Sequence, residues 1–330
     1  MSWDFIGQPT AVALLQRQLA ARRPSHAYLF AGPQGIGKHT LALAFVQSLF
    51  CERPPTPGEA CGTCPSCKMV IREQHPDLIL LATDSGGSLK IDAVRSLEHD
   101  LSLSPYQSSF RVGLLLDFEL ATISAQNALL KTLEEAPEHA ILLLTTRDIQ
   151  NLLPTIVSRC QVVPLRPVPA AELAGALMAR TGADAKRAAL LAELSAGRPG
   201  YALQLAQDET LMGRREQFAS AAFSLFSANR RERLTIATEL SDDHVKLQEY
   251  LLQWLSLWRD VLLMGCGDDT HVVNRDWAFR LKPLSRVLPP VQVLEQIDHL
   301  QEALTLLTGN VNARLLTEVL LLDWPKAALN

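Results

Sequence analysis

The most constraining feature of the chain is a glycine-rich loop that is closely followed by a cluster of cysteines. Residues 32–40 read GPQGIGKHT, the pattern of a phosphate-binding loop between a strand and a helix. In such a loop, backbone N–H groups and the helix N-terminus hold phosphate oxygens, and the lysine neutralises β/γ-phosphate charge. The candidate phosphate-binding residues are Gly32, Gly35, Gly37 and Lys38. The loop therefore predicts a nucleotide-type site in an α/β fold.

Two groups that nucleotide hydrolysis needs are missing from this site. His39 stands where a Ser or Thr hydroxyl normally binds Mg²⁺, and Thr40 lies one position further, roughly 100° round the helix. Asp117 is the carboxylate expected at the end of a later apolar strand, but Phe118 follows it where Glu would activate water. Glu119 falls on the opposite side if the chain is extended there. We expect a vestigial site in which ATP and Mg²⁺ bind weakly or not at all.

The cysteine cluster predicts a metal site. Three cysteines follow C-x2-C-x2-C spacing and a fourth ends the preceding helix, so the predicted ligands are Cys51, Cys61, Cys64 and Cys67. Such turns deliver thiolates in the tetrahedral arrangement that zinc prefers, and four protein ligands leave no open position. His75 is the second candidate for the fourth ligand, but beside Pro76 it is better explained as a turn residue. We expect a structural zinc knuckle at residues 51–67.

Composition and charge narrow the class of protein. A chain of 330 residues with 48% apolar content can form two or three domains with real cores. Its net charge of −4 argues against a broadly basic nucleic-acid-binding surface. The N-terminus lacks the pattern of a secretory signal, and no apolar run is long enough to span a membrane. We expect a cytoplasmic protein, where clustered cysteines favour metal over disulfides.

The order of periodic segments predicts three domains. Strand-like and helix-like segments alternate up to about residue 165, which implies a parallel sheet with helices on both faces. The five candidate strands are His26–Ala31, Leu78–Thr83, Val112–Asp117, Ile141–Thr145 and Val162–Leu165. Three prolines within residues 164–169 form a linker. We expect a P-loop domain at residues 1–166, a small helical lid at 167–207 and an all-helical oligomerisation domain at 208–330.

Two apolar stripes in the last domain predict helices packed in a bundle. The spacing follows i, i+3, i+4 in both. The first stripe contains Leu294, Ile297, Leu300, Leu304 and Leu307, and the second contains Leu315, Leu316, Val319 and Leu322. We expect both stripes to face the core, in a bundle that also offers an assembly surface.

Several short motifs carry a resemblance to a known family. They are Phe5–Gln8, His26–Phe30 before the loop, the cysteine knuckle, His75–Asp77, Asn127–Glu135 and Ser158–Cys160. With these motifs the chain resembles the delta-prime subunits of the bacterial DNA polymerase III clamp loader, AAA+ relatives of the gamma/tau ATPase. The resemblance is dense to about residue 165 and thinner beyond it. It implies a P-loop AAA+ fold with a five-stranded parallel sheet, an inserted zinc knuckle, a lid and a helical collar domain.

The departures from the motor subunits favour the delta-prime type. Gamma/tau subunits are expected to keep the Mg²⁺ hydroxyl, an Asp-Glu pair and an Arg in the lid near the nucleotide. This chain has His39, Phe118 and, when the 197–200 turn is aligned, Gly200 at those positions, with Arg198 close enough to leave the last point open. The alternative is an active ATPase of the gamma/tau kind that uses Thr40 and Glu119 in shifted roles.

The resemblance also implies a role for an arginine. In the family, the Arg of a motif like Ser158–Cys160 acts in trans on ATP held by the neighbouring subunit, which assigns Arg159 as the catalytic residue. The implied partners are the gamma/tau and delta subunits, the sliding clamp and primed DNA, within a DNA-directed DNA polymerase (nucleotidyltransferase) holoenzyme. A zinc-dependent nucleic-acid module unrelated to replication is a weaker hypothesis, because the knuckle has few basic neighbours beyond Lys68 and Arg72.

Overall fold

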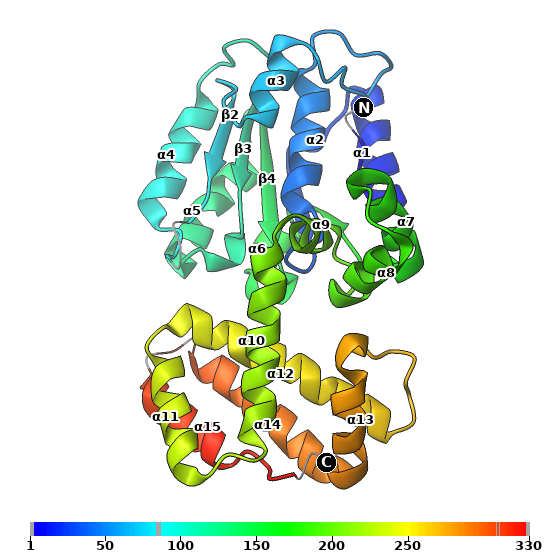
Figure 1. Cartoon of the computed structure of the whole chain (residues 1–330). Coiled ribbons are helices and arrows are strands. Elements are labelled where there is room, and N and C mark those ends of the chain that lie inside the picture. The colour runs from blue at the N-terminus through cyan, green and yellow to red at the C-terminus, as the bar shows by residue number, and fades with distance from the viewer. Residues whose placement is uncertain (1–2, 84–86, 308, 310, 328–330) are drawn as a thin grey trace. The chain divides into compact units, whose positions relative to one another are not determined.

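The chain forms two compact units. The computed structural model describes residues 3–83, 87–307, 309 and 311–327 (Figure 1). The first unit comprises Met1–Arg180 with Gly197–Ala202, and the second comprises Thr181–Ala196 with Leu203–Asn330. Within the described ranges, no helix is both long and apolar enough to cross a lipid bilayer.

The first unit is built on a five-stranded sheet in which every pairing is parallel. Its strands are β1 (Ala27–Ala31), β2 (Leu78–Leu81), β3 (Arg111–Leu115), β4 (Ala140–Thr146) and β5 (Gln161–Pro164). The strand order is β2-β3-β4-β1-β5, so the loop after β1 opens beside the end of the central strand β4. The predicted sheet is confirmed, and each strand begins and ends within two residues of its predicted bounds.

The central strands carry apolar side chains on both faces of the sheet, and helices cover both faces (Figure 1). Tyr28 and Phe30 pack into one apolar cluster, whereas Ala27 and Leu29 pack into the other. The first cluster is covered by α1 (Pro9–Ala20), α2 (Lys38–Phe50) and α3 (Pro65–Ile71). The second is covered by α4 (Ile91–Ser102), α5 (Ile123–Glu134) and α6 (Pro154–Val157).

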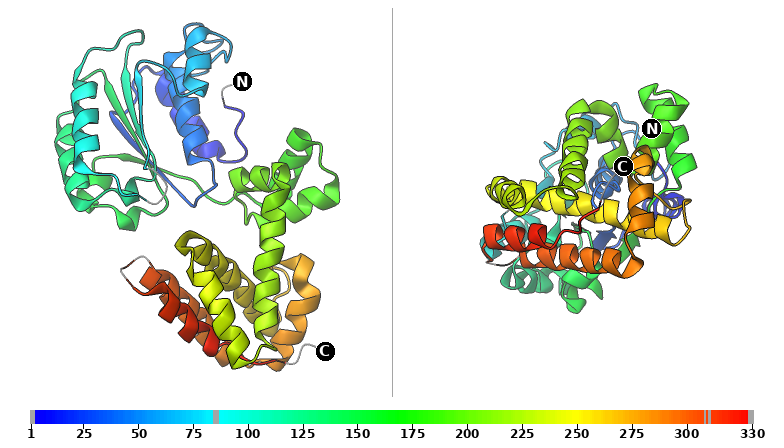
Figure 2. Two further views of the ribbon diagram at one scale, coloured as in Figure 1. Left: turned by 60° about the vertical axis from the view of Figure 1, so that its left-hand side comes forward. Right: turned by 60° about the horizontal axis from the view of Figure 1, so that its bottom comes forward.

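Shorter helices follow the proline-rich segment, as the sequence predicts. These are α7 (Ala170–Thr181), α8 (Ala185–Leu194) and α9 (Pro199–Gln207), with breaks at Gly182 and Gly197, which have positive φ. Helices α10 (Glu209–Leu225), α11 (Arg230–Ser241), α12 (His244–Gly265), α13 (Ala278–Val287), α14 (Pro290–Leu307) and α15 (Ala313–Leu322) form the bundle of the second unit (Figure 2). Its core includes Trp254, which is fully buried and donates a 2.8 Å hydrogen bond to the Phe218 carbonyl oxygen.

The two predicted leucine stripes of the bundle are only partly correct. Leu300 is buried in α14, but Leu294 is 46% exposed because the buried side is defined by Val293, Gln296, Leu300 and Ala303. In α15 the error is larger, since Leu315 is 60% and Val319 54% exposed. The residues of α15 that face the core are Ala313, Thr317, Leu320 and Leu321. An almost uniformly apolar helix offers two possible stripes, and packing against α11 and α14 selects the other one.

Candidate functional site

The predicted phosphate loop lies between β1 and α2, in the strand–loop–helix context that the motif requires. Gly35 and Gly37 have φ angles of 78° and 104°, in the left-handed region that favours glycine. Gly37 is the N-cap of α2, so Lys38 is the first residue of that helix. The backbone frame of a nucleotide site is therefore present.

The loop lysine is engaged by the loop itself. The Nζ atom of Lys38 donates hydrogen bonds to the carbonyl oxygens of Gly32 at 2.7 Å and Pro33 at 3.2 Å. Only 7% of the residue is exposed. Burial lowers the pKa of Lys38, and the carboxylates of Asp117 and Glu119 oppose that shift. The Lys38 ammonium group, which would neutralise a phosphate, is thus already hydrogen-bonded to carbonyl oxygens of the loop.

The first turn of α9 docks on the same loop. The carbonyl oxygen of Gly35 accepts hydrogen bonds from the backbone N–H of Gly200 at 2.8 Å and of Tyr201 at 3.3 Å. A Cβ atom on Gly200 would lie 2.8 Å from that oxygen, so a larger residue does not fit there without movement. Arg198 instead lies over the Tyr201 ring, 4.6 Å from its centroid. Gly200, the residue aligned with the expected arginine, therefore lies directly against the loop.

The side chains that would hold Mg²⁺ have other neighbours. The Nε2 atom of His39 lies 3.1 Å from a carboxylate oxygen of Glu73, outside hydrogen-bonding geometry. Thr40 is exposed on α2. Asp117 follows β3 as predicted and adopts a left-handed conformation, with φ of 46°, while its N–H donates to Thr145 Oγ1 at 2.8 Å. Neither His39 nor Thr40 supplies the expected hydroxyl beside Lys38.

The expected placement of Glu119 is wrong, because the chain after Asp117 is not extended. Phe118–Leu120 form a 3₁₀ turn, and the Glu119 carboxylate partly opposes the lowering of the Lys38 pKa by burial. Its Oε1 accepts the backbone N–H of Arg147 at 3.2 Å and lies 3.4 Å from the guanidinium of that residue. Its Oε2 is buried and has no hydrogen-bond partner in the described part of the chain.

Arg159 lies two residues beyond the short helix α6, on the surface. Its guanidinium donates to the Thr155 carbonyl oxygen at 3.0 Å and forms an ion pair with Glu134 at 2.6 Å. The side chain is 35% exposed. Burial raises the pKa of the neighbouring Cys160 thiol to about 12, so that thiol stays protonated and unreactive. The motif thus presents one charged group to solvent.

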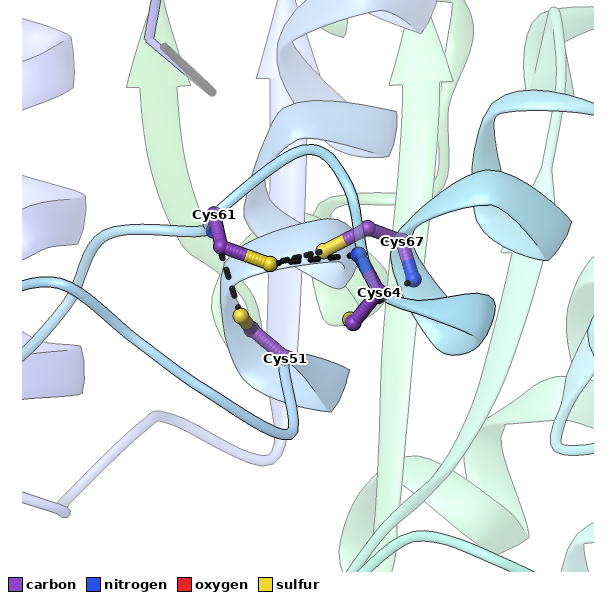
Figure 3. Close-up of side chains that lie close together, drawn as sticks. All are labelled: Cys51, Cys61, Cys64 and Cys67. Atoms are coloured by element: carbon purple, nitrogen blue, oxygen red, sulfur yellow. Dashed lines mark hydrogen bonds between the residues drawn. The ribbon is translucent and has the colours of Figure 1, made fainter.

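The four predicted metal ligands lie together (Figure 3). All four sulfur atoms are within 4.8 Å of one another, and those of Cys61 and Cys67 are 3.9 Å apart. Tetrahedral zinc with Zn–S bonds of about 2.3 Å would place its sulfurs about 3.8 Å apart. His75 is not in this group, because its Nδ1 accepts the Asp77 N–H at 3.1 Å and its ring packs on Phe50.

The electrostatics of the cluster also suit a divalent metal. Backbone N–H groups of Cys61, Cys64 and Cys67 donate to the sulfurs of Cys51, Cys61 and Cys64, respectively. Hydrogen bonds from Thr63 and Cys64 lower the pKa of Cys61 to about 6, whereas burial raises the pKa values of Cys51 and Cys67. A bound cation would offset the charge of buried thiolates that the protein alone does not stabilise. The cluster therefore fits a structural metal.

Three features of these sites were missed in the sequence. Glu134 lies in ion-pair contact with Arg159, Gly200 contacts the phosphate loop, and Phe5 packs so closely on Gly37 that a Cβ there would lie 2.5 Å from its ring. Only Glu134 carries a local signal, since two consecutive glutamates at a helix C-terminus oppose the helix dipole. The other two contacts join residues that are far apart in the sequence.

Comparison with known proteins identifies the family. Residues 7–169 match the family model of "DNA polymerase III, delta subunit", and residues 209–326 match that of its C-terminal region. The delta' subunit of Escherichia coli DNA polymerase III is 32% identical over 307 residues, which cover 91% of this chain and 89% of that protein. The chain belongs to the delta-prime family of DNA polymerase III subunits. The resemblance inferred from the motifs is confirmed.

Tau subunits of DNA polymerase III are also similar to the chain. The tau subunit of Bacillus subtilis is 36% identical over 158 residues, which cover 48% of this chain but only 28% of tau. A gamma-subunit-related protein of Thermotoga maritima aligns over 94% of this chain with 20% identity and a TM-score of 0.44. The predicted α/β fold with a five-stranded parallel sheet is confirmed by the strand pairing, and the four cysteines of the predicted knuckle lie together.

Proposed function

We propose that this chain is a delta-prime-type subunit of the replicative clamp loader, which helps to place the sliding clamp on primed DNA. It assembles with gamma/tau and delta subunits in the cytoplasm, and residues 208–330 form the collar through which it does so. The chain does not hydrolyse ATP itself and supplies Arg159 to ATP held by a neighbouring subunit. Full-length similarity to a delta' subunit supports the role, and partial similarity to tau supports the partner.

The observation that carries the non-hydrolytic role is the docking of α9 on the phosphate loop. The Gly35 carbonyl oxygen is bonded to the amides of Gly200 and Tyr201, and Lys38 is bonded to loop carbonyls. Bound ATP would have to displace lysine hydrogen bonds and would still lack the Mg²⁺ hydroxyl that His39 replaces. Each feature weakens nucleotide binding, and together they leave no complete hydrolytic site.

The exposed guanidinium of Arg159 is suited to act in trans. A guanidinium is always charged and presents several donors, so it can stabilise the charge that develops on a transferred phosphoryl group. Arginine fingers typically contribute about 10³–10⁵-fold in rate. The chain's own phosphate loop is built from other elements than the α6 segment, which leaves Arg159 available to a partner.

The decisive test is steady-state ATPase of a loader reconstituted with gamma/tau and delta, in the presence of clamp and primed DNA. We expect Arg159→Ala to reduce the stimulated rate strongly while assembly stays intact. Arg95→Ala, which removes an exposed arginine from α4, is the matched control and should leave the rate unchanged. Equal rates for the two variants would reduce Arg159 to an ordinary surface residue and leave the subunit a purely architectural role.

An active ATPase of the gamma/tau kind is the second candidate, and one observation favours it. The charge of Glu119 opposes the lowering of the Lys38 pKa by burial, and one buried Glu119 oxygen has no partner in the described residues. Tight Mg²⁺-ATP binding that Lys38→Ala abolishes, together with turnover by the purified chain alone, would establish this candidate. We expect neither, and we expect Lys38→Ala to leave the ATPase rate of the assembled loader unchanged.

We also propose that Cys51, Cys61, Cys64 and Cys67 bind one structural zinc ion. All ligand positions are then filled by the protein, so the metal stabilises the fold of residues 51–67 and takes no part in a reaction. Binding energies at such sites are on the order of 10 kcal/mol and contribute directly to local folding. Metal analysis of protein purified without chelator tests this proposal, and protein that is folded and metal-free would refute it.

A further inference from the structure

The C-terminal end of α5 contains charges that the fold alone does not explain. Glu134 is the last residue of the helix and Glu135 is its C-cap, so two carboxylates lie at the negative end of the helix dipole. Helices are stabilised by cations at this end, and acidic residues there reduce stability. Acidic residues in this unfavourable position often have a functional contact that explains them.

That contact is with Arg159. The Nη2 atom of Arg159 lies 2.6 Å from Glu134 Oε1, and its Nη1 atom donates to the Thr155 carbonyl oxygen at 3.0 Å. A guanidinium has five N–H donors, so these two bonds leave three for another acceptor. Glu134 touches one edge of the group, and the side chain of Arg159 remains 35% exposed.

Helix α5 also fixes the backbone from which Arg159 projects. Gln126 is buried, donates to the Ala121 carbonyl oxygen at 3.2 Å, and accepts the Leu153 N–H at 3.0 Å just before α6 begins. Ile156, in the middle of α6, is fully buried. One helix therefore holds the start of the arginine segment through Gln126 and its end through Glu134.

We propose that Glu134 is a positioning residue that orients Arg159 toward the nucleotide of the neighbouring subunit. This inference depends on the proposed role of Arg159 in trans. A free arginine side chain loses rotamer freedom when it is ordered, and holding it in advance lowers the barrier at the moment of reaction. Because both partners are partly exposed, the effect is modest, roughly two- to five-fold in rate.

The test is a double-mutant cycle in the reconstituted loader with Glu134→Gln, Arg159→Ala and the combined variant. We expect Glu134→Gln to lower kcat roughly two- to five-fold and leave the KM for ATP unchanged, because the oriented guanidinium acts in the transition state. In the Arg159→Ala background the same change should have no effect. Glu135→Gln removes an equal charge one residue away and is the matched control, which should behave as the wild type.

The outcomes separate this inference from the proposed function. An unchanged rate for Arg159→Ala would refute the arginine finger itself. A large loss for Arg159→Ala with equal rates for Glu134→Gln and Glu135→Gln would keep the finger and refute the positioning role. A faster Glu134→Gln loader would also refute it, because the carboxylate would then compete with phosphate for the guanidinium. A rise in KM without a change in kcat would indicate an assembly or binding effect, which likewise contradicts positioning.

Discussion

The contact between α9 and the phosphate loop can be tested by adding a single methyl group. In Gly200→Ala the new Cβ would lie 2.8 Å from the Gly35 carbonyl oxygen, closer than side-chain carbons approach backbone oxygens. The loop backbone or the helix must then move apart. That movement stretches the hydrogen bonds from Gly200 and Tyr201 to the same oxygen, now 2.8 and 3.3 Å long.

The expected magnitude follows from these contacts. Overpacking a rigid site costs about 1–3 kcal/mol. Each weakened hydrogen bond adds about 0.5–1.5 kcal/mol. Replacing glycine by alanine in a helix stabilises the fold by up to about 1 kcal/mol, which partly offsets these losses. The net loss in stability of the first unit is therefore about 1–6 kcal/mol, which corresponds to a drop in melting temperature of roughly 2–24 °C.

Thermal unfolding and amide hydrogen exchange provide the assay. Gly175→Ala is the matched control, because Gly175 also lies in a helix of the first unit and an added Cβ there would meet nothing within 4 Å. We expect Gly175→Ala to raise the melting temperature slightly and Gly200→Ala to lower it, with faster exchange of the Tyr201 amide. If Gly200→Ala were as stable as Gly175→Ala, with Tyr201 exchange unchanged, α9 would not be docked on the loop as described.

Three further substitutions test the metal site and two buried charges. Cys64→Ser should lose the zinc and unfold residues 51–67 locally, which metal analysis and hydrogen exchange would detect. Asp77 is buried, which raises its pKa, but backbone N–H bonds from residues 106–108 outweigh burial and lower it overall. Asp77→Asn should therefore lower the free energy of unfolding by about 2–4 kcal/mol at neutral pH. The difference in stability between wild type and variant should disappear as the pH falls below 3.8 through the folded pKa of Asp77. Arg215→Ala should destabilise the helical bundle by about 3–5 kcal/mol in chemical denaturation because it leaves Asp276 without its buried partner, whereas the exposed Arg214→Ala should have little effect.

The sheet and the cysteine cluster could be predicted because their signals are local. Each strand is a short apolar run between turn residues, and the four cysteines lie within residues 51–67, where C-x2-C turns bring thiolates together. The phosphate loop was placed correctly for the same reason. Short-range patterns therefore determined the framework of the first unit.

Features that depend on long-range packing could not be predicted in this way. In α15 the exposed side carries Leu315 and Val319 while the buried side includes Thr317, so apolar periodicity points to the wrong face of the helix. A 3₁₀ turn follows Asp117 where an extended chain was expected, and nothing in residues 117–120 identifies that turn. In both places the outcome depends on neighbouring elements from elsewhere in the chain.

The glycine pattern of the loop illustrates why a nucleotide motif does not establish nucleotide binding. A Cβ on Gly35 would lie 2.9 Å from that of Tyr201, and one on Gly37 would lie 2.5 Å from the Phe5 ring. Both positions also have positive φ. Contacts within the protein therefore require glycine here whether or not a phosphate ever binds. The residues that distinguish the two cases lie outside the motif, in α9 and near the N-terminus, where Tyr201 packs against Gly35 and Phe5 against Gly37.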